Sequence, residues 1–468
     1  MANISLYFSH LMAIMGNKIK QGNIDMYRDI EENLLRWKNQ QDHMPLLLRG
    51  ARQVGKTFVV EKFGKEHFES IVMINFELQP EMIRCFDNLD PTEIINAIFL
   101  TTNQKITPKN TLLFLDEIQD CPNAIRSLRY FKEKCPQLYV IGAGSLLEFI
   151  LNDANFRMPV GRIQSLYLKP LSFKEFLVGG NNQQLREFIE QVNIDTKIPT
   201  MVHEKLLKLL HDYMILGGMP SVLKKYFATQ NMSECQEMQT ILLNTYRQDF
   251  GKYAKKTDHR YLQRLYEKIP GLIGENFKYS KVDPDIRSRD IKDALYMLQN
   301  AGITYPVYCT AASGVPLASF VNEKKFKVLF LDIGLMTRAG KLNIEILRNE
   351  DILLADRGMP AEQFVGQELL AYGSPFEESN LYFWSREQRS SMAEVDFVTT
   401  VDANIIPIEV KAGTTGRLKS LHLFMDEKKS LCGIRLSQHP IGRVNNIISL
   451  PLYMAAEISR IVQTLQIG

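Results

Sequence analysis

The sequence has few residues of the kinds that mark cross-linked or membrane-embedded proteins. Its 468 residues include six cysteines and two tryptophans, and no two cysteines form a C-x-x-C pair. Neither a zinc knuckle nor a disulfide framework is indicated, and reduced thiols in a cytoplasmic protein are expected. No stretch approaches about 18 consecutive apolar residues, so no membrane-spanning helix and no membrane partner are expected.

An excess of charge of either sign is also missing. The 56 Lys and Arg nearly balance the 53 Asp and Glu, so any nucleic-acid-binding surface must be local. At about 100 to 200 residues per domain, the length predicts about three domains. Residues 1–25 lack a basic start and a clear cleavage site, which favours a loosely ordered lead-in over a signal peptide.

A glycine-rich segment after a short apolar run is the clearest functional motif in the sequence. Residues 50–57 read GARQVGKT, which matches G-x-x-x-x-G-K-[ST] at each fixed position. Backbone N–H groups there can cradle phosphates, Lys56 can reach the β- and γ-phosphates, and Thr57 can ligate Mg²⁺. The expected ATP-binding residues are Gly50, Gln53, Val54, Gly55, Lys56, Thr57 and Phe58.

Two acids end a second apolar strand, residues 111–115. Asp116 can hold Mg²⁺, and the adjacent Glu117 can polarise the attacking water. Two acids that merely start a loop are the alternative, which the complete phosphate-binding motif weakens. We therefore expect ATP hydrolysis with Glu117 as the base and with Thr57 and Asp116 as the metal ligands.

Two further polar residues are candidates for contact with the γ-phosphate. Ser145 follows the apolar strand 138–141, where it can report the nucleotide state or merely cap the helix 146–151. Arg162 precedes a strand over 163–168 and can act in cis, act on a neighbouring subunit, or be an ordinary surface arginine. Action on a neighbour would require a homo-oligomer.

Several of these strings together resemble a known family. LLLRGARQVGKT, then LLFLDEIQ, VIGAGSLL, GRIQSLYLKPLSFKEFL and LGGMP are similar to prokaryotic AAA-type ATPases related to the archaeal ATPases. The resemblance runs from about Met26 to about Asp426. It implies a parallel-sheet α/β P-loop NTPase core over 26–180 and a helical lid over 181–257. Ala143 stands where the family has threonine.

The region after the core carries helices and local positive charge. Residues 199–225 predict two helices separated by the Leu-Gly-Gly-Met-Pro of 216–220, and this segment is the expected lid over the nucleotide. The stretch 247–264 can be a solvated face or can contact phosphates. Its basic residues are Arg247, Lys252, Lys255, Lys256, Arg260 and Arg264.

A winged-helix-like domain is expected over 258–345. A helix that follows residues 286–291, a strand from Ile303 to Cys309, a turn and a strand from Phe326 to Leu331 have the order of a winged helix. Its recognition helix would carry Arg287, Arg289 and Lys292 on or before its first turns, where they can enter a major groove. Winged helices also dock proteins and act as spacers, so both uses remain open.

A hairpin is expected near the C-terminus. Residues 394–401 alternate apolar and polar side chains, a turn follows, and 405–411 returns. At period two, Glu409 and Lys411 share one face, and Asp396 on the neighbouring strand can lie beside Glu409. Two such carboxylates can bind a divalent cation, and Lys411 can orient a water or stabilise charge on a phosphorane.

Asp followed by Glu-x-Lys on a hairpin resembles the PD-(D/E)XK restriction-endonuclease-like fold. The resemblance implies a C-terminal α/β domain over 346–468 and a further acid from the preceding helix, Glu362 or Glu368, with Glu362 preferred. Many such domains keep acids for stability or for ligand binding, so nuclease activity is a separate question.

Two classes of function fit these patterns. The first is an ATPase that binds or processes double-stranded DNA through its C-terminal domains. The second is a nucleotide-controlled switch or scaffold whose endonuclease-like domain is inactive and whose partner is a protein. Both use ATP and Mg²⁺. The pair of acids at Asp116 and Glu117 favours hydrolysis over passive binding.

Overall fold

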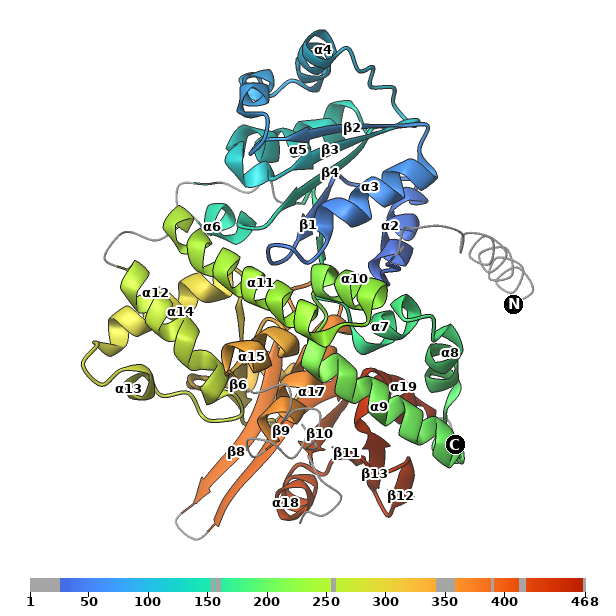
Figure 1. Ribbon diagram of the computed structural model, residues 1–468, viewed down its shortest axis with the longest axis vertical. Helices are drawn as coiled ribbons and strands as arrows, with labels where there is room; N and C mark the ends of the chain where they lie inside the picture. The colour runs from blue at the N-terminus through green and yellow to red at the C-terminus, as the bar shows by residue number, and fades with distance from the viewer. Residues whose placement is uncertain are drawn as a thin grey trace.

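The structure is a computed structural model that describes residues 26–152, 156, 161–253, 258–341, 358–388, 391–411 and 418–465. The expected lead-in over 1–25, and Lys255 and Lys256 of the basic stretch, lie outside the described residues. Figure 1 shows two sheets at opposite ends of the molecule, with helices α10 and α11 between them and α9 alongside the C-terminal sheet. The six cysteines are free, as the composition indicated. Among the described residues, no helix is long and apolar enough to cross a membrane.

The N-terminal sheet is parallel. Within the described ranges its strand order is β2-β3-β4-β1-β5. The strands are β1 Leu46–Arg49, β2 Ser70–Asn75, β3 Thr111–Asp116, β4 Tyr139–Gly144 and β5 Gln164–Tyr167. Because all five run in the same direction, their carboxyl ends meet at one edge, where the P-loop and the acids follow β1 and β3. The predicted α/β P-loop core is confirmed.

Helices cover both faces of this sheet, which explains why its strands are apolar on both sides. Leu112 and Phe114 of β3 share a core with the helices on one face, and Leu113 and Leu115 belong to the core on the other face. The helices of the first face are α2 Ile30–Lys38 and α3 Lys56–His67, and those of the second are α4 Pro91–Thr102 and α5 Pro122–Lys134.

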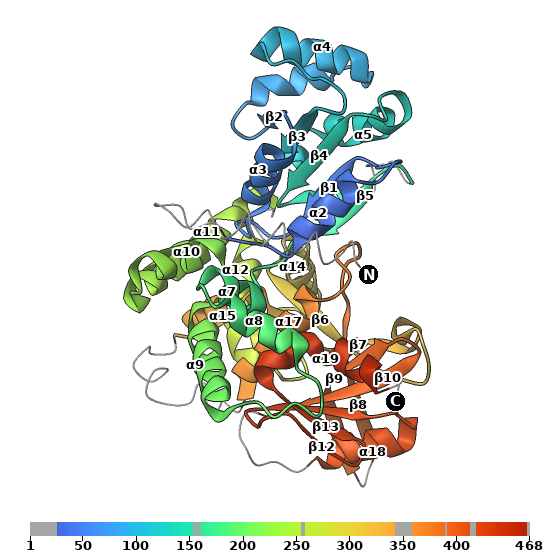
Figure 2. The same ribbon diagram turned by 90° about the vertical axis from the view of Figure 1, so that its right-hand side faces the viewer.

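The middle of the chain is helical. Its helices are α6 Leu147–Leu151, α7 Phe173–Gly179, α8 Gln183–Gln191, α9 Thr200–Leu216, α10 Pro220–Thr229, α11 Met232–Tyr253, α12 His259–Lys268, α13 Tyr279–Val282, α14 Ser288–Asn300 and α15 Ile333–Ala339. The predicted break between α9 and α10 is confirmed. Only part of the expected lid lies near the P-loop, because α9 runs toward the C-terminal part of the chain, where His203 hydrogen-bonds Tyr453, just after β13, at 2.8 Å. Figure 2 shows this course.

Asp332 joins the break between α9 and α10 to α15. Its fully buried carboxylate accepts hydrogen bonds from the backbone N–H of Gly218 at 2.6 Å and of Leu335 at 2.9 Å. The second bond caps the N-terminus of α15. Burial raises the pKa of Asp332 to about 6, which shows that desolvation outweighs these donors.

Removal of the Asp332 carboxylate should lower stability more than most surface changes. In Asp332→Ala, two buried N–H groups lose their acceptor, and each such loss costs about 1–3 kcal/mol. We expect the free energy of unfolding to fall by about 2–5 kcal/mol in chemical denaturation. Asp120→Ala, which removes an exposed acid, is the matched control and should change it by less than about 0.5 kcal/mol.

The C-terminal sheet is mixed and larger. In the described residues its order is β12-β13-β11-β10-β9-β8-β6-β7. Its strands are β6 Thr304–Thr310, β7 Val321–Phe330, β8 Leu381–Gln388, β9 Ser391–Val401, β10 Asn404–Val410, β11 Gly433–Ser437, β12 Gly442–Val444 and β13 Ile447–Pro451. Its helices are α17 Met359–Ala371, α18 Lys419–Lys428 and α19 Ile458–Thr464.

One pairing in this sheet differs from the expectation of a free-standing winged helix. The predicted hairpin exists as β6 and β7, but β6 also pairs in parallel with β8, with Val307 opposite Leu381. The expected wing is therefore continuous with the C-terminal strands β8, β9 and β10. Pairing with β8 satisfies the backbone N–H and C=O groups that β6 would expose as an edge strand. This is the physical reason that the β6–β7 hairpin joins the C-terminal sheet.

Candidate functional site

The P-loop has the local geometry that its motif predicts. Gly50 has φ +147°, and a Cβ atom there would lie 2.3 Å from the carbonyl oxygen of Leu168. Gly55 has φ +99° and immediately precedes α3. Both positions therefore require glycine. The N-terminus of α3 consequently faces the loop, with its unpaired N–H groups available to phosphate oxygens.

Lys56 lies under the P-loop rather than in solvent. Its Nζ donates to the carbonyl oxygens of Gly50 at 2.9 Å and Ala51 at 2.8 Å, and the residue is 6% exposed. Burial lowers the pKa of Lys56 to about 8, against the opposing effect of Glu117 and Asp116. At neutral pH the group is therefore mostly an ammonium ion held at the phosphate-binding loop.

Asp116 is the last residue of β3 and lies beside Thr57. Its Oδ2 accepts hydrogen bonds from Thr57 Oγ1 at 2.9 Å and from Asn75 Nδ2 at 3.1 Å. Burial raises the pKa of Asp116, and the Thr57 hydrogen bond opposes that rise. Two oxygen donors from the predicted pair thus meet at one point, which fits a hard cation such as Mg²⁺.

Glu117 is positioned by its backbone and by two neighbours. It has φ 47°, an unusual value for a side chain of this size, directly after β3. Its Oε2 accepts hydrogen bonds from Gln119 Nε2 at 2.8 Å and from Ser145 Oγ at 3.3 Å. The alternative role of Ser145 as a helix cap is not supported, because α6 has no side-chain cap.

Arg162 does not join this group. Its half-exposed guanidinium lies 3.5 Å from Glu133, in the last turn of α5. It precedes β5, whose first residue pairs with the first residue of β1, so it lies at the amino edge of the sheet. The P-loop follows the opposite end of β1. The prediction that Arg162 reaches the γ-phosphate in cis is therefore wrong; action on another subunit stays a prediction.

Sequence reasoning missed the residues that connect the P-loop to the rest of the chain. Buried Arg28 donates to Val54 O at 2.8 Å and pairs with Glu175 at 3.0 Å. Arg52 pairs with Asp249 of α11 at 3.2 Å, and Tyr246 of α11 donates to Arg52 O at 2.5 Å. The basic composition of 247–264 did not reveal this role of α11.

Asn75 and Gln119 were missed as well, although each had a usable signal. Asn75 is the polar residue that ends the apolar strand β2, next to β3 in the sheet. Gln119 lies two residues after Glu117 and contacts it. Polar residues at the carboxyl ends of neighbouring parallel strands are expected to meet, and a search for them would have found Asn75.

The predicted C-terminal carboxylates also come together. Asp396 Oδ2 accepts a hydrogen bond from Val410 N at 2.8 Å, and Lys411 Nζ lies 2.5 Å from Glu409 Oε1. Glu362 of α17 contacts Lys327, as Asp396 does, whereas Glu368 accepts a hydrogen bond from Phe173 N elsewhere. The preference for Glu362 agrees with this placement.

Burial changes the protonation of these acids. It raises the pKa of Glu362 to about 8 and that of Glu409 to about 7, and in both cases the nearby Asp396 raises the pKa further. Among the residues that the structure describes, no three Asp, Glu, His or Cys side chains are grouped as metal ligands. The expected divalent-cation site of Asp396 and Glu409 stays a prediction.

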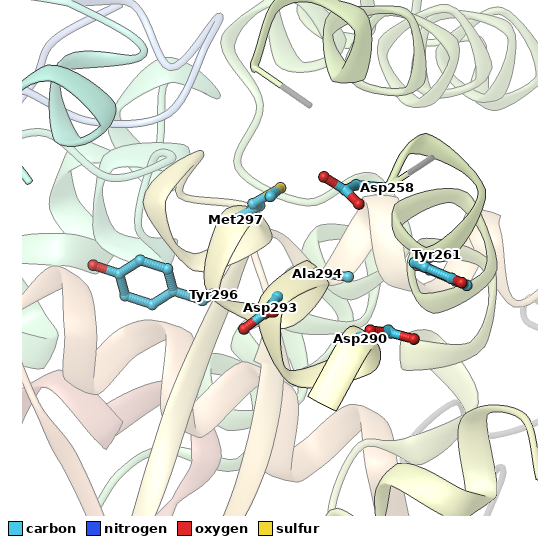
Figure 3. A pocket seen from close by; sticks show the side chains of 7 residues that line it. All are labelled: Asp258, Tyr261, Asp290, Asp293, Ala294, Tyr296 and Met297. Carbon is cyan, nitrogen blue, oxygen red and sulfur yellow. The ribbon is translucent and has the colours of Figure 1, made fainter. Parts of the chain in front are cut away.

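The expected recognition helix, α14, carries charge of both signs. Arg287, Arg289 and Lys292 are exposed at its start. A pocket between α12 and α14 is lined by three aspartates, together with other side chains (Figure 3). These aspartates are Asp258, Asp290 and Asp293. Because these aspartates repel phosphates, the pocket itself disfavours phosphate binding.

Comparisons with known families agree with the first site. Residues 42–177 match the profile described as an AAA domain. Residues 207–345 and 357–453 match two domains of unknown function, DUF8612 and DUF4143. With the P-loop geometry above, the first match shows that the chain carries an AAA-type P-loop domain. No curated protein matches the chain.

Several solved structures are similar to parts of the chain. The Walker-type ATPase PABY2304 of Pyrococcus abyssi is 16% identical, with a TM-score of 0.44 over 68% of this chain and 96% of that chain. The Orc1 protein of Aeropyrum pernix, in complex with DNA, is 11% identical, with a TM-score of 0.30 over 68% and 94%. The RuvB Holliday junction branch migration motor of Thermotoga maritima is 14% identical, with a TM-score of 0.29 over 60% and 89%.

Proposed function

We propose that this chain binds ATP and hydrolyses it in a Mg²⁺-dependent reaction. The observation that carries the proposal is the convergence of Thr57, Asp116 and Glu117 beside a complete P-loop, with Thr57 and Asp116 2.9 Å apart. Thr57 and Asp116 would hold Mg²⁺, which neutralises charge on the β- and γ-phosphates when bound. A passive binding site would not need a second acid at the end of β3.

Glu117 is the base in this proposal. Its side chain accepts three hydrogen bonds, from Gln119 Nε2, Ser145 Oγ and Ser145 N, and all go to Oε2, so Oε1 can accept a proton from a water molecule. Gln119 and Ser145 fix the direction of the carboxylate, because each donates to the same oxygen. Lys56 binds the phosphates, and the first turn of α3 supplies backbone N–H donors.

The contacts of α11 favour a function in which the nucleotide controls the rest of the chain. Arg52 lies inside the P-loop motif and binds Asp249 of α11, and Tyr246 of α11 binds the Arg52 carbonyl. A phosphate in the loop attracts the same guanidinium, so ATP binding competes with the Arg52–Asp249 ion pair. We therefore propose α11 as the element that transmits the nucleotide state to α15 and the C-terminal sheet.

We propose duplex DNA as the partner whose binding the nucleotide state controls. The proposal rests on the exposed cations Arg287, Arg289 and Lys292. Phosphate release should rise when duplex DNA is added at low salt, and the rise should shrink as salt screens the contact. Arg287→Ala/Arg289→Ala should lose the stimulation and keep the basal rate. Arg36→Ala/Lys65→Ala removes equal charge from exposed positions elsewhere and should keep both. No stimulation in the wild type would favour a protein partner.

A further inference from the structure

A buried lysine from the middle of the chain lies among the C-terminal carboxylates. Lys327 of β7 is 3% exposed, and its Nζ lies 2.7 Å from Glu394, 3.3 Å from Glu362 and 3.8 Å from Asp396. Burial alone would lower the pKa of Lys327, but these three carboxylates raise it above its ordinary value. The lysine is therefore an ammonium ion inside the cluster.

Glu362, Glu394, Asp396 and the neighbouring Glu409 each have a carboxylate oxygen bound by a group of this chain, and Glu409 Oε2 is buried without a hydrogen-bond partner. Glu394 Oε1 and Glu362 Oε2 bind Lys327, and Glu394 Oε2 accepts a hydrogen bond from Asn276 at 3.0 Å. Asp396 Oδ2 is taken by the backbone of Val410. A hard divalent cation needs six or more oxygen ligands or waters at one point, and here an ammonium ion already fills that point.

The chain before β7 also closes over this cluster. A Cβ atom at Gly274 would lie 3.2 Å from either oxygen of Glu362, so the backbone is packed against that carboxylate. Phe277 N donates to Phe326 O at 2.8 Å, which fixes this segment to β7 beside Lys327. A phosphodiester approaching Glu362 would have to displace this cover.

We propose that Lys327 is the resident cation of the cluster formed by Glu362, Glu394 and Asp396, beside which Glu409 pairs with Lys411. The cluster neither takes up a divalent cation nor cuts DNA, and it joins β7 to α17 and β9 by buried ion pairs. A buried ammonium ion and a divalent cation repel each other strongly at such short distances, so the two exclude each other. Removal of the lysine charge should then create the metal site that the sequence predicted.

Mn²⁺ titration of the full chain without nucleotide tests this proposal. The wild type and Asp396→Asn should give the same binding isotherm, because the cluster contributes no site. Lys327→Met should gain one Mn²⁺ site at the cluster, and the affinity of the cluster for Mn²⁺ should rise by at least about tenfold over the wild type. Lys327→Met/Asp396→Asn should lose that site, which separates it from binding at Asp116.

If Lys327→Met does not fold, a comparison of the wild type with variants that keep Lys327 decides the question. A Mn²⁺ site in the wild type that disappears in Glu409→Gln, or plasmid nicking by the wild type that Lys411→Ala stops, would overturn the proposal. Identical isotherms for the wild type and Glu409→Gln, with intact plasmid, support it. A folded Lys327→Met chain with no added site would show that Lys327 does not exclude the metal.

Discussion

In Glu117→Gln, ATP turnover is expected to fall by about 100-fold or more while ATP affinity stays within a few fold. Glutamine keeps the size of the side chain and can still contact Ser145 and Gln119, but it cannot take a proton from water. The P-loop and the Thr57–Asp116 pair remain intact, so binding should survive. Steady-state phosphate release gives the turnover, and calorimetric titration with ATP gives the affinity.

A neighbouring acid supplies the control for Glu117. Asp120 lies three residues further on and is exposed. Asp120→Asn removes the same charge without touching the phosphates, and its turnover should stay within about twofold of the wild type. If Glu117→Gln turned over ATP at the wild-type rate, Glu117 would not be the base, whatever the affinity.

Lys56→Ala should weaken ATP binding by about 100-fold or more, because it removes a buried, charge-assisted donor to the phosphates. A fluorescent ATP analogue or calorimetry measures the loss. Lys65→Ala on the same helix removes a charge whose side chain is 67% exposed, and it should bind ATP normally. Equal affinity in Lys56→Ala and the wild type would contradict the assignment of the P-loop as the ATP site.

The lowered pKa of Lys56 predicts that ATP affinity depends on pH. The free protein carries the Lys56 ammonium ion below about pH 8 and loses it above that value. ATP affinity should therefore decline as the pH rises through about 8. The decline should be absent in Lys56→Ala, since no group remains there to titrate.

The ATP site could be predicted from the sequence because its determinants are local. A glycine pattern, one lysine and a hydroxyl within eight residues specify the loop, and the two acids are adjacent at the end of one apolar strand. Parallel strands then bring Asp116 to Thr57 without further information. Ser145 followed from the same rule, since β4 lies beside β3.

The contacts that sequence reasoning missed join segments far apart in the chain. Arg28 binds Glu175, Asp332 caps α15 and binds Gly218, and Lys327 enters the carboxylate cluster. The local sequence around a single charged residue does not reveal its partner, because the burial of that residue depends on the tertiary packing. Lys327 in particular follows Lys324 and Lys325 and resembles part of a solvated strand.

The pairing of β6 with β8 was missed for a related reason. Alternation predicts that a segment is a strand, but it does not say which strand lies beside it. The hairpin of β6 and β7 could be predicted because only residues 311–320 connect them, whereas β8 comes after α15 and α17. The expected C-terminal hairpin, β9 and β10, was confirmed on the same local grounds.

Phosphate release from ATP by the purified wild-type chain, with Mg²⁺ and then with excess EDTA, tests the central claim most directly. We expect steady turnover with Mg²⁺ that stops when EDTA is added and is nearly absent in Lys56→Ala and Glu117→Gln. Phosphate release that is the same in the wild type and both variants, or that continues in EDTA, would contradict Mg²⁺-dependent hydrolysis at this P-loop.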